Sequence, residues 1–250
     1  MGQKAILIIG MHRSGSSLLT GLLHSCGVNL GKELLPALPE NPKGFYENAK
    51  FYQLNEEILL QLGTDWSEIA SKKTLNSNHT NRKLIINKII NSIESEFGSS
   101  PLFCVKDPRI TLLFPYYYEA LSMLNIEIFI VNCTRDKLEI AKSLNKRNKF
   151  EMSYALALTL YYSKCVSELK KRYDIIDIDY QDTLKNPVQV IEKIKEYGQL
   201  SFHVRPEVVK DIISRNLYRN KATKGNILLY IIGYLKYYRI KFKKWLQYLL

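Results

Sequence analysis

Four short apolar runs punctuate the chain, and stretches with helical spacing of apolar residues lie between them. The runs are rich in Ile, Val and Leu, which is typical of strands buried on both faces of a parallel sheet. Alternation of such strands with helices predicts an α/β fold, with a parallel sheet of about four to five strands and helices on both faces. The predicted strands are Ala5–Ile9, Leu102–Val105, Glu127–Asn132 and Asp174–Ile178.

Apolar positions between these runs recur at the three- to four-residue spacing of amphipathic helices. Pro187 and Pro206 stand where the first turn of a helix tolerates proline. Turn-forming residues mark loops at 36–44, 99–101 and 221–226. The predicted helices are Ser16–Ser25, Ala49–Leu62, Thr80–Phe97, Ile110–Leu124, Asp136–Asn145, Ser153–Arg172, Pro187–Tyr197 and Pro206–Asn216.

Charge divides the chain into two parts. The net charge is +12, but residues 215–250 hold nine of the 36 Lys/Arg side chains and no acid. The remaining 27 basic and 24 acidic residues leave the first 214 positions at only +3. A nearly neutral body argues against nucleic acid as a partner. We therefore expect a main domain over residues 1–220 and a basic amphipathic C-terminal segment over 221–250.

The C-terminal segment carries apolar and cationic side chains together. Only nine uncharged residues precede Lys236, too few to span a bilayer. As a helix, it places aromatic and apolar residues on one face and cations on another, which suits peripheral contact of residues 226–250 with an anionic membrane. Packing on the body with exposed lysines is the alternative. The apolar face holds Tyr238, Phe242, Trp245 and Leu249, and the cationic face holds Lys236, Arg239 and Lys243.

Cysteine usage and the lack of a long apolar segment bear on the compartment. The four cysteines are widely spaced and lie in apolar runs, so we expect buried, reduced thiols. The first apolar run is too short for a signal peptide or a membrane span. The expected location is the cytoplasm, with peripheral contact at the inner membrane face through the C-terminal segment.

The first apolar run leads into Gly10-Met11-His12-Arg13-Ser14-Gly15-Ser16-Ser17 and then into an apolar helix. A glycine-bounded loop that opens a helix directs backbone N–H groups and the helix dipole at one point, which predicts an anion site. A tight turn without a ligand is the alternative. A nucleoside-triphosphate loop would place a lysine after its second glycine. Ser16 stands there instead, so the loop does not have the usual triphosphate arrangement.

At these residues the chain resembles the sulfotransferase superfamily, especially bacterial members that open with GMHRSGTSLL. The resemblance spans most of residues 4–200 and implies a P-loop NTPase-like sulfotransferase fold. It also implies 3'-phosphoadenosine 5'-phosphosulfate (PAPS) as the donor of a sulfuryl group, bound without a metal. In that family the basic residue of the loop neutralises charge on the leaving oxygen. By resemblance, the 5'-phosphosulfate is held by Arg13, Ser14, Gly15, Ser16 and Ser17.

Two further motifs resemble the nucleotide-binding residues of the family. Arg135 ends the third predicted strand and Ser143 follows eight residues later, as in the family's 3'-phosphate site. Lys137 replaces the usual proline there, which should leave both phosphate ligands in place. Tyr180 begins a segment that resembles YEDLLxxP, which implies contact with the adenine. A packing tyrosine, or a surface arginine with a helix serine, is the alternative.

The reaction centre is expected around two other segments. Residues 41–48 resemble the bacterial NPKGYFE, and residues 106–109 resemble KDPR at a strand end. By resemblance Lys106 is a second cation on the transferred group. A histidine base often follows that lysine in relatives and is missing here, so Asp107 and Glu47 are the candidate bases, with Asp107 ahead. His12 ranks below both, and local ion pairs are the alternative for these charges.

The expected function is transfer of a sulfuryl group from PAPS to an acceptor hydroxyl. The bacterial resemblance points to a carbohydrate or glycolipid as the acceptor. One alternative is a magnesium-dependent P-loop kinase or NTPase with an atypical loop, which would use an acid at the end of the run 102–107 or 175–179. Another is a catalytically silent, membrane-associated nucleotide-binding protein.

Overall fold

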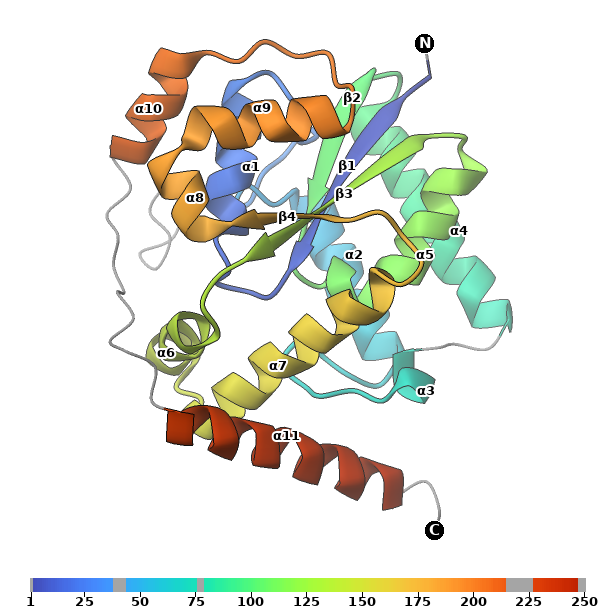
Figure 1. Cartoon of the computed structure of the whole chain (residues 1–250). Helices are drawn as coiled ribbons and strands as arrows, with labels where there is room; N and C mark the ends of the chain where they lie inside the picture. The colour runs from blue at the N-terminus through green and yellow to red at the C-terminus, as the bar shows by residue number, and fades with distance from the viewer. Residues whose placement is uncertain (1, 38–43, 76–78, 215–226, 247–250) are drawn as a thin grey trace.

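A computed structural model of the chain describes residues 2–37, 44–75, 79–214 and 227–246. Its centre is a four-stranded, entirely parallel sheet in the order β2-β1-β3-β4 (Figure 1). The predicted α/β class, with a parallel sheet of four strands and helices on both faces, is confirmed. The strands are β1 (Lys4–Gly10), β2 (Leu102–Lys106), β3 (Glu127–Thr134) and β4 (Ile176–Asp179).

Successive residues of β1 point to opposite faces of the sheet, as strand geometry requires. Ile6 and Ile8 belong to the core on one face, and Ala5, Leu7 and Ile9 belong to the larger core on the other. The first face is covered by α1 (Ser16–Ser25), α9 (Pro187–Tyr197) and α10 (Pro206–Ser214). The second is covered by α2 (Ala49–Gln61), α4 (His79–Phe97), α5 (Ile110–Met123), α6 (Lys137–Asn148) and α7 (Met152–Leu169).

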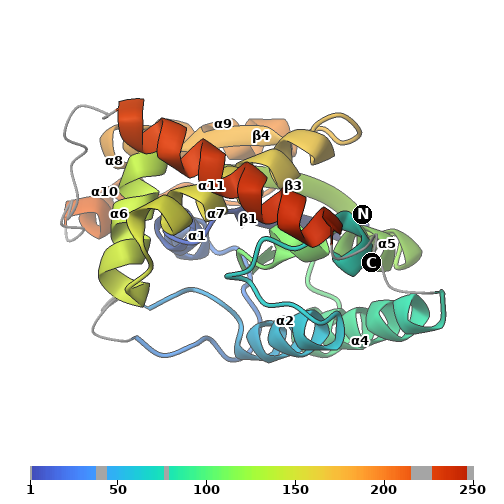
Figure 2. The same cartoon turned by 90° about the horizontal axis from the view of Figure 1, so that it is seen from below.

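Three short or terminal elements complete the described part of the chain. The helix α11 (Ile227–Leu246) lies along α7 on the outside of the second layer (Figure 2). The helices α3 (Lys72–Leu75) and α8 (Tyr180–Lys185) were not predicted from the sequence. Helices of four and six residues are too short to show a helical period in the sequence, so only a capping residue can indicate them. For α8 that cap is Asp179, whose Oδ1 accepts a hydrogen bond from the Gln181 N–H at 2.7 Å.

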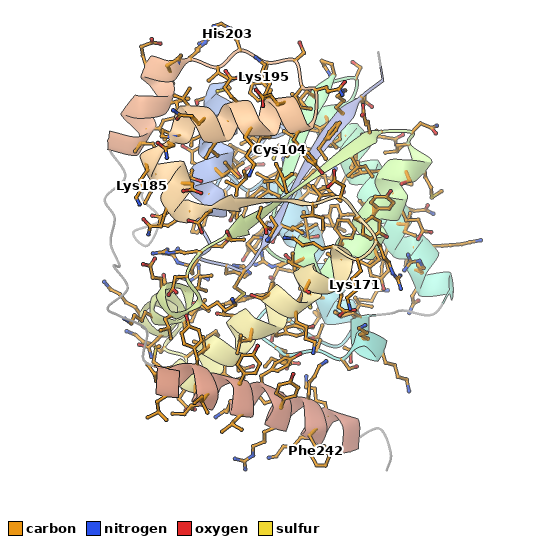
Figure 3. The ribbon with its side chains drawn as sticks, viewed as in Figure 1. Cys104, Lys171, Lys185, Lys195, His203 and Phe242 are labelled. Atoms are coloured by element: carbon orange, nitrogen blue, oxygen red, sulfur yellow. The ribbon has the colours of Figure 1, made fainter. Side chains whose placement is uncertain are left out.

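Cysteine burial agrees with the expectation from the sequence. All four cysteines are free, and Cys26, Cys104 and Cys133 are buried. Cys104 lies in the middle of the molecule, on β2 (Figure 3). Burial raises the pKa of the Cys133 thiol to about 12, so the thiol stays protonated at neutral pH.

All four strands end at the same edge of the sheet, and the register brings their following loops together. Ile8 pairs with Lys106, Gly10 with Cys133, and Thr134 with Asp179. Ligands of open α/β sheets gather at this edge. Gly10 permits the close approach of β1 to β3, because a Cβ there would lie 2.7 Å from the Cys133 carbonyl oxygen. The fold therefore places the predicted loop, the KDPR segment and Arg135 around one region.

Candidate active site

The loop between β1 and α1 has an unusual backbone. Arg13 adopts a left-handed conformation with φ +69°, and Gly15 follows with φ +99°. A non-glycine residue pays a cost of order 1 kcal/mol or more for such a backbone, so the surrounding structure must hold it. Gly15 must lack a side chain, since a Cβ there would lie 2.4 Å from Cδ2 of Tyr180. The backbone of the loop is therefore fixed by its left-handed turn and by contact with Tyr180, the first residue of α8.

Helix α1 opens directly onto this loop without a capping side chain. Its N-cap is Gly15, no side chain accepts its first N–H groups, and its first turn contains no acid. The first N–H groups of a helix need partners, and the positive end of the helix dipole favours a negative one. The geometry of the loop thus fits an anion at the start of α1.

Two cavities lie on either side of this helix start and share Arg13, Ser16 and Ser17. The first cavity has a volume of about 150 Å³ and is also lined by Gly15, Arg135 and Tyr180; it is called the nucleotide-side cavity because these residues belong to motifs that resemble the family's nucleotide-binding residues. The distal cavity has a volume of about 550 Å³ and is also lined by His12, Glu47, Tyr52, Trp66, Lys106, Arg109 and Arg147. A group held by the three shared residues would be reachable from both sides.

Arg135 is fixed at the rim of the nucleotide-side cavity. Its Nε donates to Glu139 at 2.8 Å, its Nη1 donates to the carbonyl oxygen of Arg13 at 3.2 Å, and its guanidinium lies 4.4 Å from the centre of the Tyr180 ring. Ser143, on α6, contacts Arg13 instead: its hydroxyl accepts a hydrogen bond from Nε of Arg13 at 2.8 Å. The structure thus brings these predicted residues together, but Ser143 is buried and does not line either cavity.

Lys106 connects β2 to the loop and to the distal cavity. Its ammonium group donates to the Ser17 hydroxyl at 3.1 Å, to the Phe45 carbonyl oxygen at 2.9 Å, and to Glu47 Oε1 at 2.5 Å. Both members of the Lys106–Glu47 ion pair are almost fully buried. Burial raises the pKa of Glu47, although the neighbouring ammonium opposes that effect. A carboxylate with a raised pKa at a cavity wall is typical of a general base.

The segment before α2 holds Glu47 in place. The Leu35 N–H donates to the Glu47 carbonyl oxygen at 2.8 Å. The next residue, Asn48, caps α2, where its side-chain oxygen accepts from the Lys50 and Phe51 N–H groups. The preceding residue, Tyr46, has a left-handed φ of +52°. Because backbone bonds and a helix cap fix both sides, the Glu47 carboxylate is positioned independently of any ligand.

Asp107 does not line either cavity, contrary to its ranking ahead of Glu47 as a base. It is fully buried, and its carboxylate accepts from the backbone and side chain of Arg109 and from Asn55. Arg109 pairs with Glu56 as well and stacks 4.4 Å from the Tyr52 ring centre. The KDPR segment therefore contributes Lys106, Pro108 and Arg109 to the distal cavity, whereas Asp107 fixes the turn into α5. Sequence spacing could not separate the adjacent polar residues Lys106 and Asp107.

Replacing Asp107 with Asn is expected to destabilise the fold, because it removes the buried negative charge that faces Arg109. Breaking a buried ion pair from one side costs about 3–5 kcal/mol, and the remaining Glu56 partner favours the lower end. Urea unfolding followed by circular dichroism measures this loss. Stability equal to wild type would contradict the structural assignment of Asp107.

His12 lies against the wall of the distal cavity rather than against a neighbouring strand. Its ring centre is 4.2 Å from that of Trp66. Burial lowers the pKa of His12, and the cations Arg109, Arg147, Lys106 and Arg13 lower it further, so the imidazole is neutral at pH 7. Its Nε2 is buried and has no hydrogen-bond partner among the described residues. Sequence reasoning missed the role of Trp66 in this wall, since no motif marks it.

Several expected residues lie outside the described part of the chain. Lys43 of the segment that resembles NPKGYFE falls there, as do Lys221, Lys224 and Gly225 of the basic C-terminal segment. Residues 215 and 216 of the last predicted body helix fall there too.

Comparison with solved structures identifies the fold. The sulfotransferase domain from the Synechococcus PCC 7002 olefin synthase superposes with a TM-score of 0.53 at 12% identity, over 94% of each chain. The sulfotransferase domain from the curacin biosynthetic pathway superposes with a TM-score of 0.50 at 15% identity, over 91% of this chain and 82% of that domain. Sulfotransferase STF9 from Mycobacterium avium superposes with a TM-score of 0.51 at 11% identity, over 86% of this chain and 68% of that protein.

No protein-family model and no curated protein sequence matches the chain. At these identities the likeness to solved structures concerns the fold. It nevertheless extends over 94% of this chain for the olefin synthase domain. The chain therefore has the fold of the bacterial sulfotransferases, as its motifs predict.

Proposed function

We propose that this protein transfers a sulfuryl group from PAPS to an acceptor hydroxyl. The observation that carries the proposal is the pair of cavities that meet at Arg13, Ser16 and Ser17. A transfer reaction needs a donor and an acceptor to approach one reacting centre from opposite sides. The likeness in fold to three sulfotransferases supports this chemistry over others that use the same edge of a sheet.

The donor belongs in the nucleotide-side cavity. The uncapped start of α1 and Arg13 favour the 5'-phosphosulfate, and Arg135 at the rim favours the 3'-phosphate. Tyr180 flanks both Gly15 and Arg135, which suits contact with the adenine. Ser143 would act mainly through Arg13, since its hydroxyl already accepts from that side chain.

Sulfuryl transfer then needs a base and charge neutralisation on the acceptor side. The acceptor oxygen forms a bond to sulfur while the bond from sulfur to the 5'-phosphate oxygen breaks. Glu47 takes the hydroxyl proton, and Arg13 with the loop N–H groups stabilises the charge that develops on the leaving phosphate. Lys106 lies between Glu47 and Ser17, where its charge can stabilise the transferred oxygens.

The distal cavity favours a carbohydrate or the sugar of a glycolipid as the acceptor. Trp66 and Tyr52 line it, and aromatic rings pack well against the C–H faces of sugars. The neutral imidazole of His12 supplies a hydrogen-bonding nitrogen without adding another cation. We assign His12 to positioning a hydroxyl of the acceptor, and Glu47 to proton removal.

A magnesium-dependent kinase is less well supported by the placement of its required acids. Asp107 is occupied by Arg109 and Asn55. Asp179 caps α8 and accepts from the Thr134 hydroxyl at 3.3 Å. Both acids at the relevant strand ends therefore serve the fold, and Ser16 still stands where a triphosphate loop has its lysine.

Incubation of the protein with ³⁵S-labelled PAPS and a panel of acceptors tests the proposal. The panel should contain oligosaccharides, glycolipids, simple alcohols and amines, with product formation followed chromatographically. We expect label in at least one hydroxyl-bearing acceptor, with carbohydrate acceptors favoured. Label in amines alone would contradict hydroxyl transfer, and label in simple alcohols alone would contradict the carbohydrate assignment.

Replacing Arg135 with Ala is expected to weaken donor binding more than it slows chemistry. One charge-assisted phosphate contact contributes about 1.5–3 kcal/mol, so the Kd for 3',5'-adenosine bisphosphate should rise about 10- to 150-fold. Titration calorimetry measures this change. The Arg135→Lys variant should recover part of the affinity, whereas an unchanged Kd in Arg135→Ala would remove Arg135 from the donor site.

A further inference from the structure

The C-terminal helix α11 has an inner face that is packed tightly on the body. Tyr237 is 2% exposed, and a Cβ on Gly233 would lie 2.6 Å from the Leu156 side chain of α7. Tyr230 and Ile240 join the same core. Two ion pairs also join the helix to the body, from Lys236 in the middle of α11 to Glu151 and from Lys244 near its C-terminal end to Glu68. This confirms one of the two expectations for the segment, namely that it packs on the body.

The outer face of α11 is apolar as well. Seven of the eleven exposed large apolar side chains in the described part of the chain lie on this one helix, each between 39% and 66% exposed. Figure 3 shows Phe242 projecting away from the body. Apolar patches of this kind on soluble proteins mark interaction sites. The outer face consists of Leu228, Ile231, Ile232, Tyr234, Leu235, Tyr238 and Phe242.

Cationic side chains accompany this face, and the helix contains no acid. Arg239, Lys241 and Lys243 are exposed and have no acidic partner among the described residues. A second copy of the chain would bring the same cations against them, so the charge opposes self-association through this face. A nucleic acid would use the cations but leave the Ile and Leu side chains in water. An anionic lipid surface satisfies both sets at once.

We propose that the outer face of α11 binds at the interface of a membrane that contains anionic lipids. The apolar residues enter the boundary between headgroups and acyl chains, and Arg239 and Lys243 contact the headgroups. None of the helices in the described part of the chain has the length and apolar composition needed to cross a membrane, so the contact is peripheral. This inference does not depend on the sulfuryl-transfer proposal.

The position of α11 also bears on the distal cavity. Both ion-pair partners of α11 are close in sequence to residues that line that cavity. Glu68 follows Trp66 by two residues, and Glu151 follows Asn148 by three. Membrane binding through α11 would therefore hold one wall of the distal cavity beside the lipid surface. If the transfer proposal is correct, this arrangement favours an acceptor carried by a lipid.

Vesicle flotation of the full-length protein tests the inference. Vesicles of phosphatidylcholine alone are compared with vesicles that contain 30% phosphatidylglycerol (about a third anionic lipid, well above the neutral control), at low and high salt. We expect binding to the anionic vesicles that weakens at high salt. The triple variant Ile231→Gln/Leu235→Gln/Phe242→Gln should bind at least about tenfold more weakly, because partitioning scales with buried apolar area.

A matched control variant replaces exposed apolar side chains elsewhere on the protein. The triple variant Leu60→Gln/Leu84→Gln/Met123→Gln changes exposed apolar residues outside α11 and should bind like wild type. Arg239→Gln/Lys243→Gln should lose binding mainly to the anionic vesicles. Substitutions are preferable to truncation, since removing α11 would uncover the surface of α7 around Leu156.

Three results would overturn the inference. Equal vesicle binding by wild type and the outer-face triple variant would remove this face from the contact. If the wild-type protein bound neither type of vesicle, a membrane would be excluded as the partner of this face. A wild-type dimer in analytical ultracentrifugation that becomes monomeric in the outer-face variant would assign the face to a second copy instead. Equal melting temperatures, and equal stabilisation by 3',5'-adenosine bisphosphate, would establish that the variants are folded and that the donor site is separate.

Discussion

Replacing Arg13 with Ala is expected to lower kcat for sulfuryl transfer by about 10²–10³-fold, the usual cost of losing one preorganised charge at the reacting centre. Arg13 lies in both cavities and beside the uncapped start of α1. Its charge is thus available where the leaving oxygen becomes negative. Initial rates with labelled PAPS and the best acceptor of the panel measure the effect.

The fold should survive this change. Alanine keeps the backbone of the loop, and the Arg13 side chain has a hydrogen bond to Ser143 rather than a place in either core. Arg172→Ala, which removes an exposed arginine remote from the loop, is the matched control and should retain full activity. Near-normal turnover by Arg13→Ala with a normal melting temperature would contradict the assignment of the loop cation.

Replacing Glu47 with Gln is expected to lower kcat by about 10²–10⁴-fold, the range for loss of a general base. Glutamine keeps the size of the side chain and can still accept from Lys106, but it removes the charge that faces the buried ammonium, so a loss of stability is expected as well and turnover is measured well below the melting temperature of the variant. Glu57→Gln is the matched control, since Glu57 also pairs with a lysine, Lys88, but at the surface. A turnover of Glu47→Gln within a few-fold of wild type would exclude Glu47 as the base.

The pH dependence of the wild-type enzyme gives a second readout for Glu47. Burial raises the pKa of this carboxyl above its usual value, and only the ionised form can take a proton. Activity should therefore be complete at pH values above the raised pKa and should fall as the pH drops through it. The Glu47→Gln variant should lack this acidic limb, and persistence of the limb would assign it to another group.

Much of the fold was predictable because the local signals were strong. The strands β1, β2 and β3 contain apolar runs that predicted them. Gly10 and Gly15 indicated the turn between β1 and α1. The strand order and the register were not predictable, since they depend on contacts between segments that are far apart in the sequence, such as Lys4 with Glu127 and Val131 with Ile176. The first residues of the fourth predicted strand, Asp174 and Ile175, stay outside β4, because only residues 176–179 pair with β3.

The candidate site was predictable in part. Motifs located Arg13, Lys106, Glu47 and Arg135, and the shared edge of the sheet brings them together. Motifs could not decide whether Asp107 or Glu47 faces a cavity, because both follow a plausible pattern and burial depends on Arg109 and Asn55. They also did not indicate that the ring of His12 would lie on Trp66, which comes from the irregular segment between α2 and α3.

The loop of residues 10–17 is expected to bind a 3'-phosphorylated adenosine nucleotide without the help of magnesium. Thermal unfolding with 3',5'-adenosine bisphosphate, compared with ADP plus Mg²⁺ at equal concentration, tests this expectation most directly. Ligand at 100 times its Kd stabilises a protein by about 2.7 kcal/mol, which corresponds to a rise in Tm of several degrees. We predict that rise with 3',5'-adenosine bisphosphate in the presence of EDTA and a smaller one with ADP–Mg²⁺. Stabilisation by ADP–Mg²⁺ alone would contradict PAPS as the donor and favour a kinase or NTPase.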